Sequence, residues 1–275
     1  MSMVQKEQNQ ASPVEEAKTE APTENSVELC GLRKRLGGLV VLNGVSLKIH
    51  RGETMCIIGG SGAGKSVTLK HIVGLMQPDE GHVLVNGVNI TSAKGEELEE
   101  VRKGIGFCFQ GAALLNSLTV FDNVALPLQE HEGLEGSELE DRVMSKLDLV
   151  GLEEAAKKMP SELSGGMKKR VGLARAIIRN PGIILYDEPT AGLDPVTAST
   201  INSEILDMQA KLNVSSILVT HDMSSAFRVA NRIAMLYKGE IIALGTTEEI
   251  KKHHDPRVQQ FIYGDSEGPL SRGKS

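Results

Sequence analysis

The chain has 275 residues, of which 40% are hydrophobic and 3% aromatic, and its formal net charge is −6 at pH 7. This composition is sufficient for one large globular domain with a buried core. Few aromatic side chains are present to stack on bases, and about half of the negative charge lies in residues 1–26, so the remainder carries no basic field. We therefore expect no nucleic acid as a partner.

The chain begins with a segment that differs from the rest in composition. Residues 1–26 are rich in Gln, Glu, Ala, Thr and Pro, which predicts a disordered acidic tail. Cys30, Cys56 and Cys108 lack the spacing of a metal site and are consistent with a reducing compartment. No apolar run reaches the roughly 18–20 residues that span a bilayer. If the protein serves a membrane, we expect another chain to cross it.

The first part of the folded region predicts strands around one helix. Strands are expected from Val27 onward and at 45–49, 53–58, 82–85 and 105–110, and a helix at 65–76. The strand at 82–85 leads into the turn Asn86-Gly87, a common hairpin signal. The early alternating strands suggest an antiparallel layer beside the main sheet.

The second part alternates helices and strands after a helical insertion at 119–160, which Gly133, Gly136 and Pro160 interrupt. Helices are expected at 165–178, 196–212 and 248–253, strands at 183–186 and 216–219, and a hairpin turning at Lys238-Gly239. From Asp255 the periodicity is lost, and we expect a tail. Strands alternating with helices predict an α/β fold with a mostly parallel sheet.

A glycine-rich loop separates the strand at 53–58 from the helix at 65–76. It consists of Gly59, Gly60, Ser61, Gly62, Ala63, Gly64, Lys65 and Ser66, the pattern G-x-x-x-x-G-K-[ST]. Glycines let backbone N–H groups face one point, and the helix start adds a partial positive charge there. We predict that the loop binds the phosphates of ATP or GTP, with Lys65 at the β- and γ-phosphates and Ser66 on Mg²⁺. A glycine-rich turn without a ligand is the alternative.

Two further motifs contain candidate catalytic and phosphate-binding residues. The apolar strand 183–186 ends in Asp187 and Glu188, at the end of a parallel strand where ligands bind in open sheets. Asp187 is suited to hold Mg²⁺ and Glu188 to orient the attacking water. Ser164, Gly165 and Gly166 form a capped helix start that exposes amides, a second candidate anion site. Taken alone, these motifs also fit a solvated acidic turn and an ordinary capped helix.

In this order the motifs resemble the nucleotide-binding subunit of an ABC transporter, over about Val27 to Ile250. Residues 59–66 match the Walker A loop, Gln110 the Q-loop, 163–167 the signature motif, 183–188 the Walker B motif, 191–194 the D-loop and His221 the switch histidine. The resemblance implies a P-loop ABC-type ATPase domain over 27–250, with a helical subdomain at about 111–178 and a C-terminal extension at 251–275.

The resemblance also implies how the site works. Two copies of the chain would face each other head to tail, so that Ser164, Gly165 and Gly166 contact the γ-phosphate of the ATP held by the other copy. Glu188, His221, Lys65 and Gln110 would take part in hydrolysis, with Gln110 also sensing Mg²⁺, and Asp194 would cross the interface. Taken alone, a histidine after an apolar strand is more often a structural hydrogen-bonding residue.

The segment 109–124, together with 163–171 and 255–264, is similar to the Mce/Mla branch of the family. That branch energises lipid movement between bacterial membranes. It implies a membrane permease, an MCE-domain extracytoplasmic lipid carrier and, in some members, a small STAS-domain partner, with the ATPase peripheral at the cytoplasmic face of the inner membrane. An ATPase subunit of an importer for a polar solute remains the alternative. A soluble ATPase of DNA repair or translation, and a regulator without turnover, are disfavoured.

Two positions depart from the family pattern. The aromatic residue that usually stacks on adenine is replaced by Leu36, and Met167 stands where the signature motif commonly has Gln. A methionine cannot reproduce the amide, although it packs well in a core.

Overall fold

A computed structural model describes residues 25–271, so the tail predicted for residues 1–26 lies outside the described residues except for Asn25 and Ser26, which begin the first strand. In chain order the first elements are β1 (Asn25–Leu36), β2 (Leu39–His50), β3 (Thr54–Ile58), α1 (Lys65–Ile72), β4 (Glu80–Val85), β5 (Val88–Asn89), α2 (Glu96–Lys103), β6 (Ile105–Cys108), α3 (Val120–Glu132) and α4 (Gly136–Leu149). Two short 3₁₀ helices follow, η1 (Glu153–Ala155) and η2 (Pro160–Glu162). The remaining elements are α5 (Gly165–Ile177), β7 (Ile183–Asp187), α6 (Pro195–Leu212), β8 (Ser215–Thr220), α7 (Met223–Val229), β9 (Arg232–Tyr237), β10 (Glu240–Thr246), α8 (Thr247–Lys251) and α9 (Pro256–Tyr263).

Two sheets form the centre of the fold. The larger has the strand order β10-β9-β3-β8-β7-β6, in which β9, β3, β8, β7 and β6 run parallel and β10 pairs antiparallel with β9. The smaller has the order β2-β1-β4-β5, and all its pairs are antiparallel. The α/β fold with a mostly parallel sheet and an added antiparallel layer is thus confirmed.

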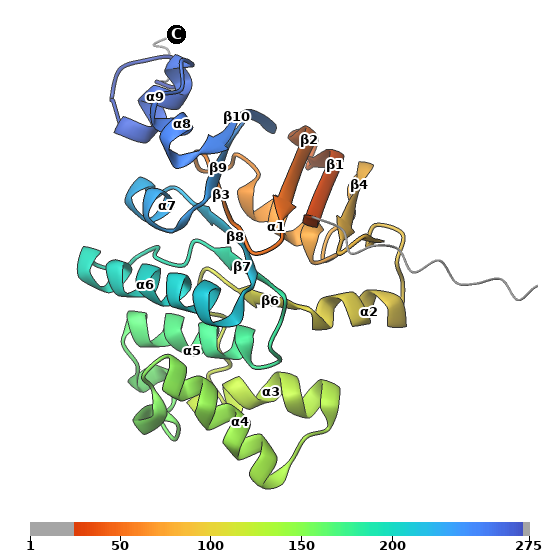
Figure 1. The fold of residues 1–275 in the computed structure, drawn as a ribbon, viewed down its shortest axis with the longest axis vertical. Helices are drawn as coiled ribbons and strands as arrows, with labels where there is room; N and C mark the ends of the chain where they lie inside the picture. The colour runs from red at the N-terminus through yellow and green to blue at the C-terminus, as the bar shows by residue number, and fades with distance from the viewer. Residues whose placement is uncertain (1–24, 272–275) are drawn as a thin grey trace, which may run out of the picture.

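The alternation of side chains along each central strand divides the core in two. On β7, Ile184 and Tyr186 pack with the buried residues of α5 and α6, whereas Ile183 and Leu185 pack with residues of the antiparallel sheet and α1. Successive side chains of a strand point to opposite faces, so the apolar run is buried on both sides. The central sheet therefore lies between a helical layer and the antiparallel layer, as Figure 1 shows.

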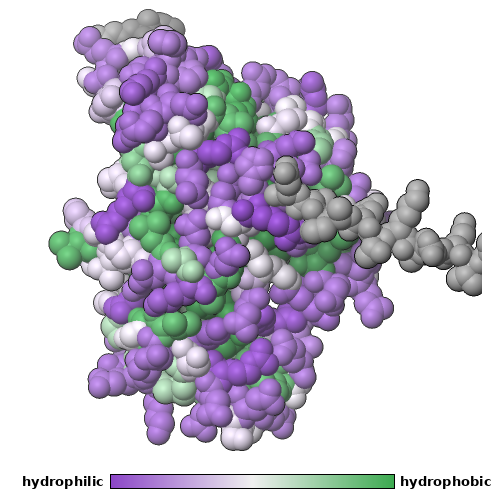
Figure 2. Space-filling model, in the orientation of Figure 1, coloured by the Kyte–Doolittle hydropathy of each residue, from purple (hydrophilic) through white to green (hydrophobic). Residues whose placement is uncertain are grey.

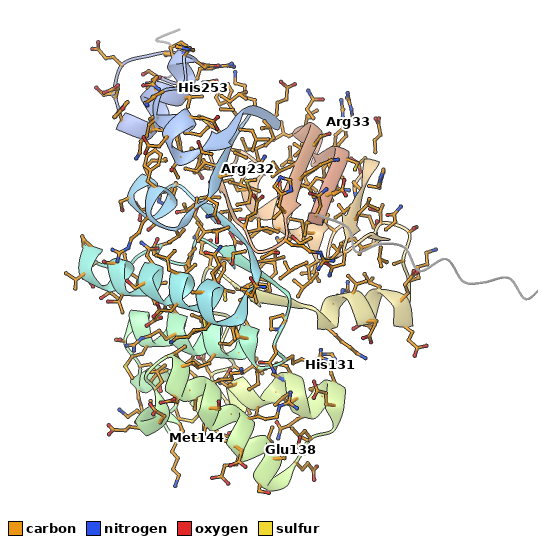
Figure 3. All side chains as sticks on the ribbon, viewed as in Figure 1. Arg33, His131, Glu138, Met144, Arg232 and His253 are labelled. Carbon is orange, nitrogen blue, oxygen red and sulfur yellow. The ribbon has the colours of Figure 1, made fainter. Side chains whose placement is uncertain are left out.

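The helical insertion forms one end of the molecule. α3 and α4 lie beyond α5 and α6, at the end opposite to α8 and α9 (Figure 1). In Figure 3, His131 of α3 and Glu138 and Met144 of α4 lie at this end, and His253, after α8, lies near the other. Gly133 ends α3 in a left-handed conformation, and Thr119 begins it with a reciprocal capping box to Asp122.

Helices α1, α2 and α9 differ from the sequence-based expectation. Helix α1 ends at Ile72 and not Met76, since Gly74 takes a left-handed φ of 67°. Helix α2 was not expected, because Leu98 and Val101 are the only apolar residues in its otherwise charged sequence. Its first turn contains glutamates and its last turn Arg102 and Lys103, which complement the helix dipole. The irregular tail expected from Asp255 contains α9, which Asp255 caps and which buries Val258 and Ile262.

Hydrophilic side chains cover most of the face shown in Figure 2, with smaller hydrophobic areas between them. Within residues 25–271, no helix combines the length and the apolar character that crossing a bilayer requires.

Candidate nucleotide-binding site

The predicted site residues gather where four adjacent parallel strands end. The strand order β3-β8-β7-β6 places the loop after β3, His221 after β8, Asp187 and Glu188 at the end of β7 and Gln110 after β6 along one edge. Ligands bind at the carboxyl ends of strands in open α/β sheets. The topology therefore brings together residues that are up to 162 positions apart, from Gly59 to His221.

The glycine-rich loop approaches neighbouring backbone closely. A Cβ atom on Gly59 would lie 2.3 Å from the carbonyl oxygen of Leu236, and one on Gly64 would lie 2.9 Å from that of Val41. Both glycines have positive φ, 154° and 105°, which a larger residue rarely adopts. The loop conformation and its place against β9 and β2 thus require glycine at both positions.

The Lys65 side chain turns back over this loop. Its Nζ donates hydrogen bonds to the carbonyl oxygens of Gly59 (2.8 Å) and Gly60 (3.2 Å) and lies 3.6 Å from Oε1 of Glu188. Only 7% of Lys65 is exposed. A buried ammonium group held at the mouth of a phosphate loop is suited to bind a polyphosphate.

Ser66 and Asp187 meet beside the loop. Oγ of Ser66 donates a hydrogen bond of 2.8 Å to Oδ1 of Asp187. Burial raises the pKa of Asp187, and the hydrogen bond from Ser66 opposes that shift. A hydroxyl and a carboxylate oxygen this close form a donor set that suits Mg²⁺, which prefers oxygen ligands and is commonly bound by one or two carboxylates together with substrate phosphates.

Glu188 has an unusual backbone conformation. Its φ is 50°, a left-handed value that costs a non-glycine residue about 1–2 kcal/mol. Its N–H donates to the carbonyl oxygen of Val219 at 3.0 Å, and only 7% of the residue is exposed. This conformation directs the carboxylate toward Lys65 and toward His221, whose Nδ1 lies 2.9 Å from Oε2.

Gln110 lies outside β6, with an exposed side chain, so β6 ends two residues earlier than expected. Its carbonyl oxygen accepts a hydrogen bond from Nζ of Lys169 on α5. The same ammonium donates to the carbonyl oxygen of Glu188 at 3.2 Å. No sequence signal distinguishes Lys169 from its basic neighbours on α5, Lys168 and Arg170.

Ser164, Gly165 and Gly166 lie against the start of α6. Ser164 caps α5 by accepting a hydrogen bond from Met167, and a Cβ on Gly166 would lie 2.6 Å from Cγ2 of Thr197. Asp194 caps α6, and its carboxylate accepts hydrogen bonds from Val196 and Thr197. Among the described residues, no hydrogen bond or ion pair is found between these three signature residues and the residues of the glycine-rich loop.

The position predicted for adenine stacking lies at the tip of the β1–β2 hairpin. Leu36, Leu39 and Val40 are 39%, 74% and 47% exposed there. They offer an apolar surface for a base, without the aromatic ring that the family usually provides.

Comparison with known proteins places this chain in a family. Residues 42–191, more than half of the chain, match the family model described as "ABC transporter". The chain belongs to the ABC transporter family. As a member of this family it binds ATP and hydrolyses it.

Three similar proteins illustrate the family relationship. The chain is 41% identical over 245 residues to the "Probable ribonucleotide transport ATP-binding protein mkl" of Mycobacterium leprae, covering 89% of this chain and 71% of that protein. It is 40% identical over 247 residues to the "Intermembrane phospholipid transport system ATP-binding protein MlaF" of Haemophilus influenzae, covering 90% and 94%. A solved dimer of the ATP-binding cassette MJ0796, bound to ADP and Pi, matches with a TM-score of 0.74 and 34% identity, covering 80% and 98%.

Proposed function

We propose that this chain is the ATP-hydrolysing subunit of an ABC system that moves phospholipid or a related lipid between membranes of the cell envelope. The observation that carries the proposal is the match to MlaF of Haemophilus influenzae, 40% identical over 94% of that protein. The resemblance of the segments 109–124, 163–171 and 255–264 to the Mce/Mla branch supports the same proposal.

A different substrate is named for another relative. The mkl protein of Mycobacterium leprae is named for ribonucleotide transport and is equally similar in sequence, but this chain covers only 71% of it. The MlaF match spans nearly the whole of both chains and is therefore the better guide to a shared role. A polar solute remains the second candidate because of the mkl name.

The site residues fit the chemistry of ATP cleavage. The glycine-rich loop would hold the phosphates, and the ammonium of Lys65 would balance the negative charge of the β- and γ-phosphates. Mg²⁺, when bound, supplies further positive charge at these oxygens, and Ser66 and Asp187, joined at 2.8 Å, are the residues that would hold it. Gln110 would extend toward that ion from the end of β6.

Glu188 and His221 would act on the attacking water. The Glu188 carboxylate is buried and fixed by its backbone, so it is suited to orient a water and accept its proton. His221 is bonded to that carboxylate through Nδ1 at 2.9 Å, and 63% of its side chain is exposed, so its other face is accessible to a γ-phosphate.

A second copy of the chain would complete each site. Ser164, Gly165 and Gly166 present a capped helix start, and within residues 25–271 this helix start makes no hydrogen bond to the glycine-rich loop. A head-to-tail dimer would bring this helix start to the ATP held by the partner copy, and Asp194 lies next to it. The dimeric arrangement of the MJ0796 cassette supports this proposal.

The remaining partners follow from the same branch of the family. We infer an integral membrane permease, an MCE-domain lipid carrier on its far side, and a small STAS-domain protein in some assemblies. The ATPase would then sit at the cytoplasmic face of the inner membrane as a peripheral subunit.

The test is to purify the chain with the membrane proteins that accompany it and to identify bound lipid by mass spectrometry. We expect phospholipid in the complex, and faster ATP hydrolysis when the complex is placed in phospholipid vesicles. A complex without lipid, whose ATPase rate instead responds to ribonucleotides, would reverse the choice of substrate. An inactive complex would remove the ATPase role itself.

A further inference from the structure

Lys169 connects two loops that are distant in sequence. It lies on α5, one turn after Gly165, and its Nζ donates to the carbonyl oxygens of Gln110 and Glu188. Gln110 follows β6, and Glu188 follows β7, its neighbour in the sheet. One ammonium group thus joins the helix that begins with the signature motif to the ends of two strands that carry predicted site residues.

One of these two contacts is made to a residue with a left-handed backbone conformation, Glu188. Glu188 holds a φ of 50°, and its N–H bonds to Val219 on β8. Lys169 bonds to the carbonyl group on the other side of the same Cα. Rotation of the Glu188 backbone toward an ordinary conformation would break one of these two bonds, so together they fix the direction of its side chain.

The surroundings favour a strong bond. The Lys169 side chain is half-buried, and hydrogen bonds from a charged donor are roughly twice as strong as those between neutral groups. Burial lowers the pKa of Lys169, while the nearby Glu188 and Asp187 carboxylates act in the opposite direction and favour the charged form.

We propose that Lys169 is a positioning residue: it fixes the peptide groups of Glu188 and Gln110 relative to each other and to α5, and so aims the Glu188 carboxylate for hydrolysis. This inference rests on the proposed role of Glu188 as the group that activates water. Helix α5 begins at the signature motif, with Ser164 as its N-cap. A displacement of α5 would therefore move the Glu188 backbone through the hydrogen bond from Lys169.

The alternative is that Lys169 only stabilises the fold. Lys146 on α4 provides a matched comparison, since it is also a half-buried lysine on a helix, its pKa is also lowered by burial, and its Nζ bonds to Oδ1 of Asn180 at 2.7 Å. It lies in the helical insertion, and in the described part of the chain it forms no hydrogen bond or ion pair with a predicted site residue.

The experiment compares Lys169→Met, Lys169→Arg and Lys146→Met in the full-length chain. Methionine keeps the length of the stem and removes every N–H donor, and arginine restores donors and charge. For each variant, kcat, KM for ATP, the affinity for a non-hydrolysable ATP analogue and the melting temperature are measured.

We expect Lys169→Met to lower kcat about 10- to 100-fold, the cost of a misplaced catalytic group, while analogue affinity changes less than about twofold. Lys169→Arg should regain much of that loss, and Lys146→Met should keep the wild-type kcat. Should Lys169→Met fail to fold, Lys169→Ala replaces it in the same comparison.

Equal kcat values for Lys169→Met and Lys146→Met, in a wild-type protein that hydrolyses ATP and loses hydrolysis on Glu188→Gln, would overturn this inference alone. Loss of analogue affinity in parallel with kcat would also overturn it. If Glu188→Gln retained full hydrolysis, the proposed function of the site would fail instead.

Discussion

His221 and Glu188 are in direct contact: Nδ1 of the imidazole lies 2.9 Å from Oε2 of the carboxylate, and the backbone N–H of His221 is 3.4 Å from the same oxygen. The two residues follow β8 and β7, which are neighbours in the central sheet. The contact holds the carboxylate from one side while Lys65 approaches its other oxygen at 3.6 Å.

Glu188→Gln should abolish hydrolysis and preserve ATP binding. The amide keeps the size and hydrogen-bonding capacity of the side chain but cannot accept a proton from water, so we expect a loss of about 10²- to 10⁴-fold in kcat. The variant should accumulate as an ATP-bound dimer, which size-exclusion chromatography with and without ATP would detect. Near-normal turnover would remove Glu188 from its proposed role.

Lys65→Ala should weaken nucleotide binding and abolish hydrolysis. The substitution removes the ammonium that bonds to the Gly59 and Gly60 carbonyls and that would face the phosphates. Isothermal titration with ATP measures the effect. Lys48→Ala is a suitable control, because Lys48 is exposed on β2 and pairs with Glu28 at 3.5 Å, and it should bind as the wild type does. Equal affinities for both variants would contradict the prediction.

Ser66→Ala and Asp187→Asn should raise the Mg²⁺ concentration needed for half-maximal hydrolysis. Ser66→Ala removes the hydroxyl that meets Oδ1 of Asp187 at 2.8 Å. Asp187→Asn replaces one carboxylate oxygen by an NH2 group and removes the negative charge that attracts the ion. We expect a shift of about tenfold or more for Asp187→Asn and a smaller one for Ser66→Ala. Titration of ATPase activity with Mg²⁺ measures this, and an unchanged midpoint in both variants would place the metal elsewhere.

Glu204 makes stability depend on pH. Its Oε2 is buried without a hydrogen-bond partner in the described region, and Arg170 approaches the other oxygen only to 3.8 Å. Burial raises the pKa of Glu204 to about 7, above the roughly 4.3 of an unfolded glutamate. The native state therefore binds more protons between those values, and this contribution to stability is complete below about pH 4.3 and lost as the pH rises through 7.

Glu204→Gln removes that titration. Relative to the variant, the wild type should lose on the order of 1 kcal/mol of unfolding free energy between pH 5 and pH 8. Denaturant unfolding of both proteins at several pH values tests this. A difference between wild type and variant that stays constant with pH would show that Glu204 does not titrate in this range.

The sequence was a good guide where local pattern and chemistry agreed. The strand before Gly59, the loop itself and the buried strand ending at Asp187 each combine an apolar run with a distinctive polar end, and all lie within a few residues of the expected bounds. Helix α2 was missed because Leu98 and Val101 are the only apolar residues in its charged sequence. Helix α9 was missed because its buried apolar residues, Val258 and Ile262, form too short a stripe to stand out.

The sequence by itself determined that the site binds nucleotide, because the phosphate loop and the strand that ends in two carboxylates are each recognisable from a short segment. Tertiary structure alone decided the contacts that join them: Ser66 to Asp187, Glu188 to His221, and Lys169 to both Gln110 and Glu188. The physical reason is that these pairs depend on which strands are neighbours in the sheet and on which face of α5 turns inward. Those properties follow from burial across the whole chain and not from any short segment.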